Sequence, residues 1–208
     1  VQRHVPTFAR WGEANSQLPA YRFMASLLQL TGWFRKDDPA RPWLLKTPQY
    51  MQDMAALLDV FPDARFLFTH RDPVQVVGSA ASLAWHQMVI QSDSVDARWV
   101  GSEWLHKTRL RIDRTLAARA CIAPARQFDV AFADMDRAPI ETMRRIYAWL
   151  GRDLDAALEQ RMRDYLARAR REHVHVPHRY ALEDFGLSAG AIRERFEDYA
   201  DRFEMLRA

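Results

Sequence analysis

Cysteine and long apolar runs are almost absent from this chain. Its 208 residues contain a single cysteine, Cys121, so an internal disulfide is impossible and a reducing compartment is favoured. No run of apolar residues approaches the ~18 that a membrane span requires. These features predict a cytoplasmic protein without a membrane span.

Glycine is also scarce, and charge of one sign does not dominate. The 7 glycines are scattered, and none forms the G-x-x-x-x-G-K-[ST] loop that cradles phosphates in many nucleotide-binding proteins. The 30 basic residues against 27 acidic ones leave a net charge of +3. Arginines alternate with acidic residues along the chain, as on solvated helix faces, so we expect no nucleic-acid partner.

Two short apolar runs predict strands. Arg41 to Leu45 and Ala64 to Thr69 both read as buried strands. Between them, Pro48 to Phe61 has the apolar spacing of an amphipathic helix. The pattern predicts a strand, a helix and a second strand, joined by a parallel crossover.

Basic residues follow both predicted strands. Lys46 follows the first and Arg71 the second, and ligands bind at the carboxyl edge of parallel sheets, so both side chains are expected in one cleft. Asp72 is suited to cap the next helix. Ser79, about two turns into that helix, could donate its hydroxyl to an anion gripped by Arg71. The alternative is an arginine paired with a carboxylate beside a surface serine, and spacing alone leaves both open.

Several motifs in a fixed order resemble the bacterial branch of the sulfotransferase family, whose members use 3′-phosphoadenosine 5′-phosphosulfate (PAPS). The family's W-x-L-K-[ST]-P and H-R-D-P motifs, the latter with a serine eight residues after its arginine, are matched here. The matching segments are Trp43 to Pro48, Phe61 to Phe66, His70 to Pro73 with Ser79, Pro139 to Gly151 and His178 to Leu187.

The resemblance implies an α/β fold: a P-loop-type parallel sheet flanked by helices, with a helix-rich C-terminal half. Residues 1–208 would be one domain, the C-terminal part of a sulfotransferase domain, with the first strand and the phosphosulfate-binding loop upstream of residue 1.

The resemblance also implies roles for individual residues. Arg71 and Ser79 would bind the 3′-phosphate of PAPS, and Lys46 would lie near the transferring sulfuryl group, with Thr47 beside it at the cofactor. Lysine is unusual here, since only three of the 30 basic residues are lysine. The loop near the C-terminus would close over the cofactor, with Arg179 meeting a phosphate and Tyr180 a ring face.

The chain departs from the family at the general base. Bacterial relatives commonly place a histidine four residues after the motif lysine, where this chain has Tyr50. A tyrosine with a reference pKa of ~10 is a poor base at neutral pH. His86 and His178 are therefore the candidate bases, although for His86 the favoured alternative is a half-buried helix histidine bonded to a neighbour. The candidate catalytic set is Lys46, Tyr50 and His86.

Other features are less informative about chemistry. Histidines at 173, 175 and 178 have no carboxylate or cysteine partner at ligand spacing, so no metal is expected. Phe132, at the end of a predicted strand, could stack on a base or serve the core. Further elements are predicted as helices at Tyr21 to Trp33, Ser94 to Ala120, Pro139 to Leu150 and Leu154 to Ala169, a strand at Phe128 to Phe132, and a final helix capped by Ser188.

The sequence therefore predicts an enzyme that moves a sulfuryl group from PAPS to a hydroxyl of a small-molecule, sugar or lipid acceptor. A non-catalytic nucleotide-binding or interaction protein derived from the same fold is the alternative. A kinase that uses ATP is disfavoured, because neither its lysine-bearing loop nor a metal-binding aspartate after a strand is found in the sequence.

Overall fold

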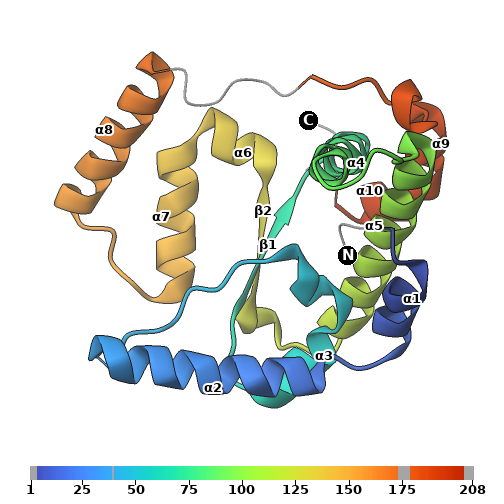
Figure 1. Ribbon diagram of the computed structural model, residues 1–208. Helices are drawn as coiled ribbons and strands as arrows, with labels where there is room; N and C mark the ends of the chain where they lie inside the picture. Colours follow the sequence, from blue (N-terminus) through green and yellow to red (C-terminus); the bar gives the residue numbers. More distant parts are fainter. Residues whose placement is uncertain (1–3, 39, 173–178, 204–208) are drawn as a thin grey trace. The chain divides into compact units, whose positions relative to one another are not determined.

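The computed structural model describes residues 4–38, 40–172 and 179–203 (Figure 1). The chain divides into two compact units, which are described separately. Unit 1 consists of Val1–Arg65 and Lys107–Ala123, and unit 2 of Phe66–His106 and Pro124–Ala208. The long helix α5, Ala97–Arg119, contributes residues to both units. Within the described ranges, no helix combines the length and apolar character needed to span a membrane.

Unit 2 contains the sheet. Strand β1, Phe66–His70, pairs in parallel with β2, Gln127–Ala131, in a register that runs from Phe66 opposite Gln127 to His70 opposite Ala131. The predicted strands at Ala64 to Thr69 and Phe128 to Phe132 are thereby confirmed, and their bounds differ from the observed ones by at most two residues. The helices of this unit are α4 Pro73–Val89, η2 Pro124–Arg126, α6 Phe132–Arg137, α7 Pro139–Leu150, α8 Ala156–Arg171, η3 Glu183–Phe185, α9 Ala189–Arg195 and α10 Glu197–Arg202. The result is the expected helix-rich α/β fold.

Helix α4 begins as its sequence predicts. The Asp72 carboxylate accepts a hydrogen bond from the Val74 amide at 2.9 Å, and Pro73 occupies the first turn. Its inner face supplies much of the core of unit 2, with Val77 and Ala81 fully buried. Helix α9 packs against α4, and its Ile192 is fully buried.

The C-terminal helix is interrupted. Ser188 caps α9 through the Ala191 amide, as predicted, but the chain leaves helical geometry at Phe196 before α10 begins. One continuous final helix was therefore the wrong prediction. The side chains expected inside are nevertheless buried: Ile192, Phe196, Tyr199 and Phe203.

Unit 1 is helical in its described residues. It contains α1 Pro6–Ala14, α2 Leu18–Arg35, the short 3₁₀ helix η1 Pro48–Gln52 and α3 Met54–Val60. Helices α2 and α3 pack on one another. Helix α2 ends at Lys36, which adopts the left-handed conformation (φ 56°) that commonly closes helices.

The predicted strand at Arg41 to Leu45 is wrong. This segment is extended but unpaired within the part of the chain that the structure describes, and Leu44 is 94% exposed. An apolar run becomes a strand only where a neighbouring strand satisfies its backbone, and Phe66–His70 has such a neighbour whereas this segment has none among the described residues. The parallel pair in this chain is therefore β1 with β2, and the predicted strand, helix and strand over residues 41–69 does not form.

The predicted helix from Pro48 to Phe61 breaks at Asp53. Its backbone (φ −152°, ψ 71°) is not helical, and its carboxylate accepts a hydrogen bond from the Ala56 amide at 3.1 Å. Because aspartate is a strong helix cap, its side chain starts α3 and leaves the preceding residues in the tighter η1.

Candidate functional site

Arg71 stands at the carboxyl edge of the sheet. The parallel register ends with His70 opposite Ala131, so the next residue on each strand, Arg71 and Phe132, emerges at the same edge. The Arg71 guanidinium carbon lies 4.3 Å from the centre of the Phe132 ring, and its Nε donates a hydrogen bond to Gln75 Oε1 at 3.0 Å. The exposed guanidinium is thus oriented by a ring face on one side and an amide on another.

His70 fixes the residue before Arg71. Its ring is 4% exposed, with Nε2 at 2.6 Å from Asp129 Oδ1 and Nδ1 at 2.8 Å from the Tyr199 hydroxyl. The ring also stacks on Phe203, with centroids 4.0 Å apart. The motif histidine therefore ties the end of β1, directly before Arg71, to β2 and α10.

Ser79 lies about two turns into α4, half-buried. Within the described ranges its hydroxyl makes no hydrogen bond, so it keeps both donor and acceptor capacity for a ligand. Arg71, Ser79 and Phe132 all belong to unit 2.

Tyr180 docks beside these residues, about a hundred positions later in the chain. Its hydroxyl donates to the Gln75 carbonyl at 3.1 Å. Its ring covers Gly78, where an added Cβ would overlap the ring and lie 2.7 Å from Leu182 Cδ2. Sequence reasoning missed Gly78, although a glycine inside a helix, next to the predicted ligand-binding serine, was a usable signal. Arg179, adjacent to Tyr180, is exposed and makes no ion pair among the described residues.

His86 is exposed near the end of α4. Its Nδ1 lies 2.8 Å from the Ser82 carbonyl of its own helix, and the Trp85 ring packs against it edge-on. A ring nitrogen that faces a carbonyl carries the proton, so Nε2 is the nitrogen that could accept another. This is the arrangement of a helix histidine bonded to a neighbour; whether it also acts as a base stays a prediction. The other candidate base, His178, lies outside the described residues.

Lys46 and Thr47 belong to unit 1. Lys46 is exposed and, among the described residues, makes no hydrogen bond or ion pair. Thr47 caps η1: its Oγ1 accepts from the Gln49 amide at 3.4 Å and also bonds the Gln49 side chain. The Thr47 hydroxyl is thus engaged by its own helix. Because Lys46 and Arg71 lie in different units, their convergence on one cleft stays a prediction.

Tyr50 is half-buried against α2. Its hydroxyl donates to Met24 Sδ at 3.4 Å, and its ring lies edge-on to Tyr21 with centroids 6.1 Å apart. Burial raises the pKa of Tyr50. Burial, followed by the charge of Asp53 and the neighbouring Tyr50, raises the pKa of Tyr21 to about 12. The Tyr50 phenol is therefore protonated at neutral pH and suited to donate a hydrogen bond rather than to remove a proton.

Asp53 anchors the end of this segment. Its Oδ2 accepts hydrogen bonds from the Ser16 hydroxyl at 2.9 Å and the Gln17 amide at 2.8 Å. Burial opposes ionisation, but hydrogen bonds from Gln17, Ala56 and Ser16 and the charge of Arg114 outweigh it and lower the pKa of Asp53. Asp53 thereby fixes η1 against the start of α2.

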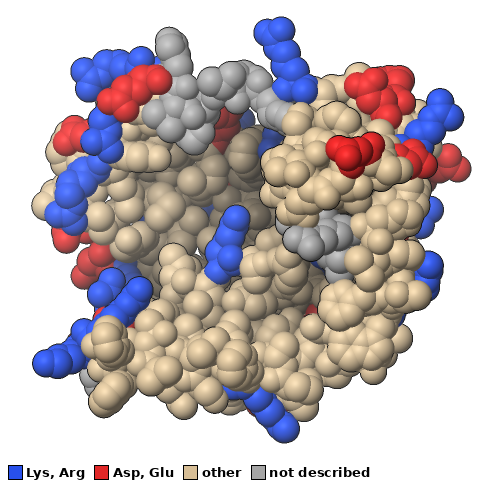
Figure 2. All heavy atoms as spheres, in the orientation of Figure 1, with Lys and Arg blue, Asp and Glu red and all other residues tan. Residues whose placement is uncertain are grey.

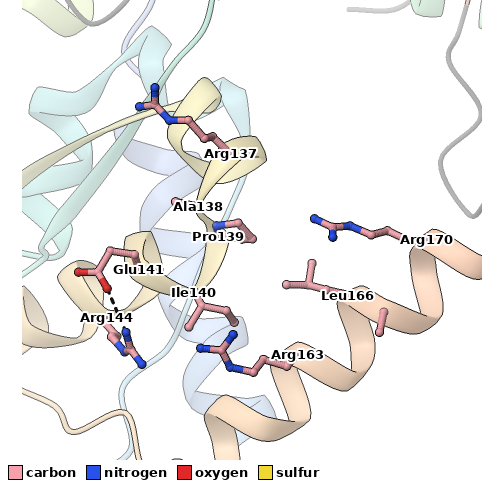
Figure 3. Close-up of a pocket in the computed structure, with 10 residues that line it drawn as sticks. Arg137, Ala138, Pro139, Ile140, Glu141, Arg144, Arg163, Leu166 and Arg170 are labelled. Atoms are coloured by element: carbon pink, nitrogen blue, oxygen red, sulfur yellow. Dashed lines mark hydrogen bonds and ion pairs between the residues drawn. The ribbon is translucent and has the colours of Figure 1, made fainter.

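A cavity of about 440 Å³ in unit 2 involves none of the predicted site residues. It lies between α7 and α8 and is lined by Arg137, Arg144, Arg163 and Arg170 over an apolar floor that includes Ile140 (Figure 3). Carboxylates already pair with most of these cations, as Glu159 does with Arg144 at 2.8 Å. Both signs of charge are likewise interspersed on the face drawn in Figure 2.

Metal ligands are not grouped in the part of the chain that is described: no three of its His, Cys, Asp and Glu side chains could hold an ion together. The histidines at 173, 175 and 178 lie outside that part.

A parallel sheet edge that presents an oriented arginine, a hydroxyl and an aromatic face is typical of α/β proteins that bind an anionic nucleotide. Comparison with known proteins identifies the family. Residues 3–156 match the model of the Sulfotransferase family, and the chain belongs to that family.

Two solved structures are similar over nearly the whole chain. The sulfotransferase STF9 from Mycobacterium avium shares 32% sequence identity with this chain, with a TM-score of 0.81. The match covers 95% of this chain and 50% of the STF9 chain. The sulfotransferase STF1 from Mycobacterium tuberculosis H37Rv shares 29% sequence identity with this chain, with a TM-score of 0.77. The match covers 94% of this chain and 49% of the STF1 chain. The chain thus spans about half the length of these relatives. No curated protein matches it.

Proposed function

We propose that the protein transfers a sulfuryl group from PAPS to a hydroxyl of a small-molecule, sugar or lipid acceptor. The observation that carries this proposal is the Arg71 guanidinium, which lies over the Phe132 ring at the carboxyl edge of the parallel sheet in a chain of the Sulfotransferase family. When bound, PAPS supplies the activated sulfuryl group.

Unit 2 would hold the 3′-phosphate half of PAPS. Arg71 presents the ends of its guanidinium fork, which suits a phosphate, since its Nε is already held by Gln75. Ser79 offers a hydroxyl without a described partner, and Arg179 a second cation. Phe132, 48% exposed, could take an adenine ring, although Arg71 covers one of its faces.

Unit 1 would serve the transfer itself. Lys46 is a compact charge suited to stabilise the negative charge that develops on the departing phosphate. Thr47 would support the cofactor beside it. Tyr50, held protonated by burial, would orient the acceptor hydroxyl by donating a hydrogen bond. From unit 2, we propose that His86 removes the acceptor proton through Nε2.

We also propose that the phosphosulfate-binding loop and the first strand precede these residues in one shared domain. The half-length coverage of the mycobacterial structures supports that proposal, since the 208 residues contain no glycine-rich phosphate loop. A bacterial source and a cytoplasmic location stay predictions, the latter from the single cysteine.

A non-catalytic nucleotide-binding protein is the second candidate, and Tyr50 at the position of the expected base favours it. Turnover separates the two. The purified protein is incubated with ³⁵S-labelled PAPS and a panel of hydroxylated acceptors, and labelled product is measured. The proposal expects transfer that Tyr50→His accelerates. Nucleotide binding without transfer to any acceptor, in both the parent and Tyr50→His, would favour the alternative.

A further inference from the structure

The cavity between α7 and α8 combines an apolar floor with a rim of arginines, and its lining contains none of the residues assigned to PAPS. Its volume of about 440 Å³ lies within the range of roughly 300–1,000 Å³ that drug-sized ligands occupy. The floor includes Leu166 and the buried Ile140. The charged residues of the lining are four arginines and one carboxylate: Arg137, Glu141, Arg144, Arg163 and Arg170. The cavity therefore suits a ligand that has an apolar part and an anionic part.

The two walls of the cavity are joined by an ion pair. Arg144, on α7, directs Nε to Oε2 of Glu159 at 3.0 Å and Nη2 to Oε1 at 2.9 Å, and Glu159 belongs to α8. Arg163 Nη2 donates to the same Oε1 at 2.7 Å. A two-point contact between a guanidinium and a carboxylate fixes geometry as well as adding energy. The cavity therefore keeps its shape without a ligand.

Arginines outnumber carboxylates around the cavity. Asp134 is shared by Arg137 at 3.0 Å and Arg145 at 3.5 Å. Glu141 bonds an arginine that another carboxylate already holds. Arg170 makes no ion pair or hydrogen bond with any described residue. Five arginines of this group therefore share three carboxylates, and the difference of two positive charges matches the dianion that a phosphate monoester forms near neutral pH.

Helix α8 presents two of the arginines and part of the floor on one face. Arg163, Leu166 and Arg170 are three and four residues apart, which is the spacing of neighbours on a helix surface. Figure 3 shows their side chains extending from α8 toward the start of α7, with Leu166 between the two arginines. A guanidinium fork matches the oxygens of a phosphate. A phosphate held by both forks would thus place an attached apolar group against Leu166 and Ile140.

We propose that this cavity binds a phosphate monoester with an apolar body, whose phosphate meets Arg163 and Arg170 while the body lies on Ile140 and Leu166. This chemistry occurs in soluble aryl phosphates and in the phosphatidate headgroup of a membrane, and the experiment separates the two sources. The inference does not depend on the proposed sulfuryl transfer.

The test begins with calorimetric titration of the purified protein with 2-naphthyl phosphate. Inorganic phosphate, which lacks the ring, and 2-naphthamide, which lacks the charge, are the comparison ligands. The ester is expected to bind at least about tenfold more tightly than either, because the forks and the floor contribute together. Equal affinity for the ester and either comparison ligand, or no binding of the ester at millimolar concentration, would overturn the inference.

Variants on α7 and α8 then locate the site. Arg170→Gln should weaken binding of the ester by about three- to tenfold, since a charge-assisted hydrogen bond is worth less at a partly exposed site than at a buried one. Arg161→Gln removes an exposed charge from the same helix but outside the lining, so it should leave the affinity unchanged. Glu141→Gln removes a carboxylate from the rim and should strengthen binding. Equal losses in the Arg170→Gln and Arg161→Gln variants would show attraction by net charge alone and would contradict the proposal.

Two further arms separate this cavity from the proposed PAPS site and identify the source of the ligand. The Arg71→Ala, Ser79→Ala double variant should bind 2-naphthyl phosphate as the parent does; a lost affinity would place the ester at Arg71 and overturn the inference. Co-sedimentation is measured with phosphatidylcholine vesicles that contain or lack phosphatidate. Phosphatidate-dependent binding that Arg170→Gln weakens would support the inference with a lipid as the source, whereas ester binding without vesicle binding would support it with a soluble ligand.

Discussion

Arg71 and Lys46, the two cations assigned to opposite ends of PAPS, are presented in contrasting ways. Arg71 follows a paired strand whose last residue, His70, is buried and bonded to Asp129 and Tyr199. Lys46 follows an exposed, extended segment that has no ladder partner among the described residues. Arg71, which we propose binds the phosphate, is therefore held in place by the fold of its own unit, whereas Lys46, which we propose serves the transfer, has no such support among the described residues. Binding and turnover should respond differently to changes at the two places.

The largest effect is expected at Lys46. Lys46→Ala removes the charge that we propose stabilises the leaving phosphate, so kcat should fall by about 100-fold or more. Because Lys46 is exposed and makes no described contact, the free energy of unfolding should change by less than about 0.5 kcal/mol. Steady-state kinetics and urea denaturation check both parts, and a large stability loss with unchanged kcat would contradict the contrast.

The reverse pattern is expected at His70. His70→Ala removes a buried ring and its hydrogen bonds to the half-buried Asp129 carboxylate and the buried Tyr199 hydroxyl, which costs about 2–4 kcal/mol of unfolding free energy. Urea denaturation measures the loss. Affinity for 3′-phosphoadenosine 5′-phosphate should also weaken, because Arg71 loses its support. A stable His70→Ala variant with normal nucleotide affinity would show that Arg71 is positioned by something else.

The Gly78→Ala substitution is expected to have a smaller effect on stability, and Gly190→Ala is its matched control. Gly78→Ala places a methyl group against the Tyr180 ring and Leu182, so unfolding free energy should fall by about 1–3 kcal/mol and nucleotide affinity with it. Gly190→Ala, also in a helix but with nothing within 4 Å of the added Cβ, should be neutral or stabilising by up to about 1 kcal/mol. Equal stability of the two variants would mean that Tyr180 does not rest on α4.

The smallest effect concerns Asp53 in unit 1. Its pKa is lowered in the folded protein, so its contribution to stability is full above the unfolded pKa of ~3.9 and is lost as the pH falls through the folded value. Asp53→Asn should therefore destabilise the protein by about 1 kcal/mol at pH 7, and the difference should disappear in acid. Thermal unfolding of both proteins at pH 7 and pH 3 measures this, and a difference that does not depend on pH would contradict the ionic contribution.

The sequence was sufficient where a signal is local. The helix start at Asp72 and Pro73, the cap at Ser188 and helix α7 are set by residues adjacent in the chain, and all were predicted. The roles of Arg71 and Ser79, which share one motif, stay predictions.

The sequence was insufficient where partners are distant. The apolar content of Arg41 to Leu45 does not reveal whether another strand lies beside it, and the cap that splits residues 48–61 at Asp53 overrides a continuous apolar pattern. The Tyr180 ring packs on Gly78, 102 positions away in the sequence, and the Arg71 guanidinium lies over the Phe132 ring, 61 positions away. Local patterns do not encode such contacts.

The central claim is that Arg71 and Ser79 bind the 3′-phosphate of the PAPS nucleotide. Calorimetric titration of the parent protein and of the Arg71→Ala, Ser79→Ala double variant with 3′-phosphoadenosine 5′-phosphate and with adenosine 5′-phosphate tests it most directly. The account predicts that the parent prefers the nucleotide with the 3′-phosphate by at least about tenfold, since a charge-assisted hydrogen bond contributes about 1.5–3 kcal/mol, and that the double variant loses this preference. An unchanged preference in the folded double variant would contradict it.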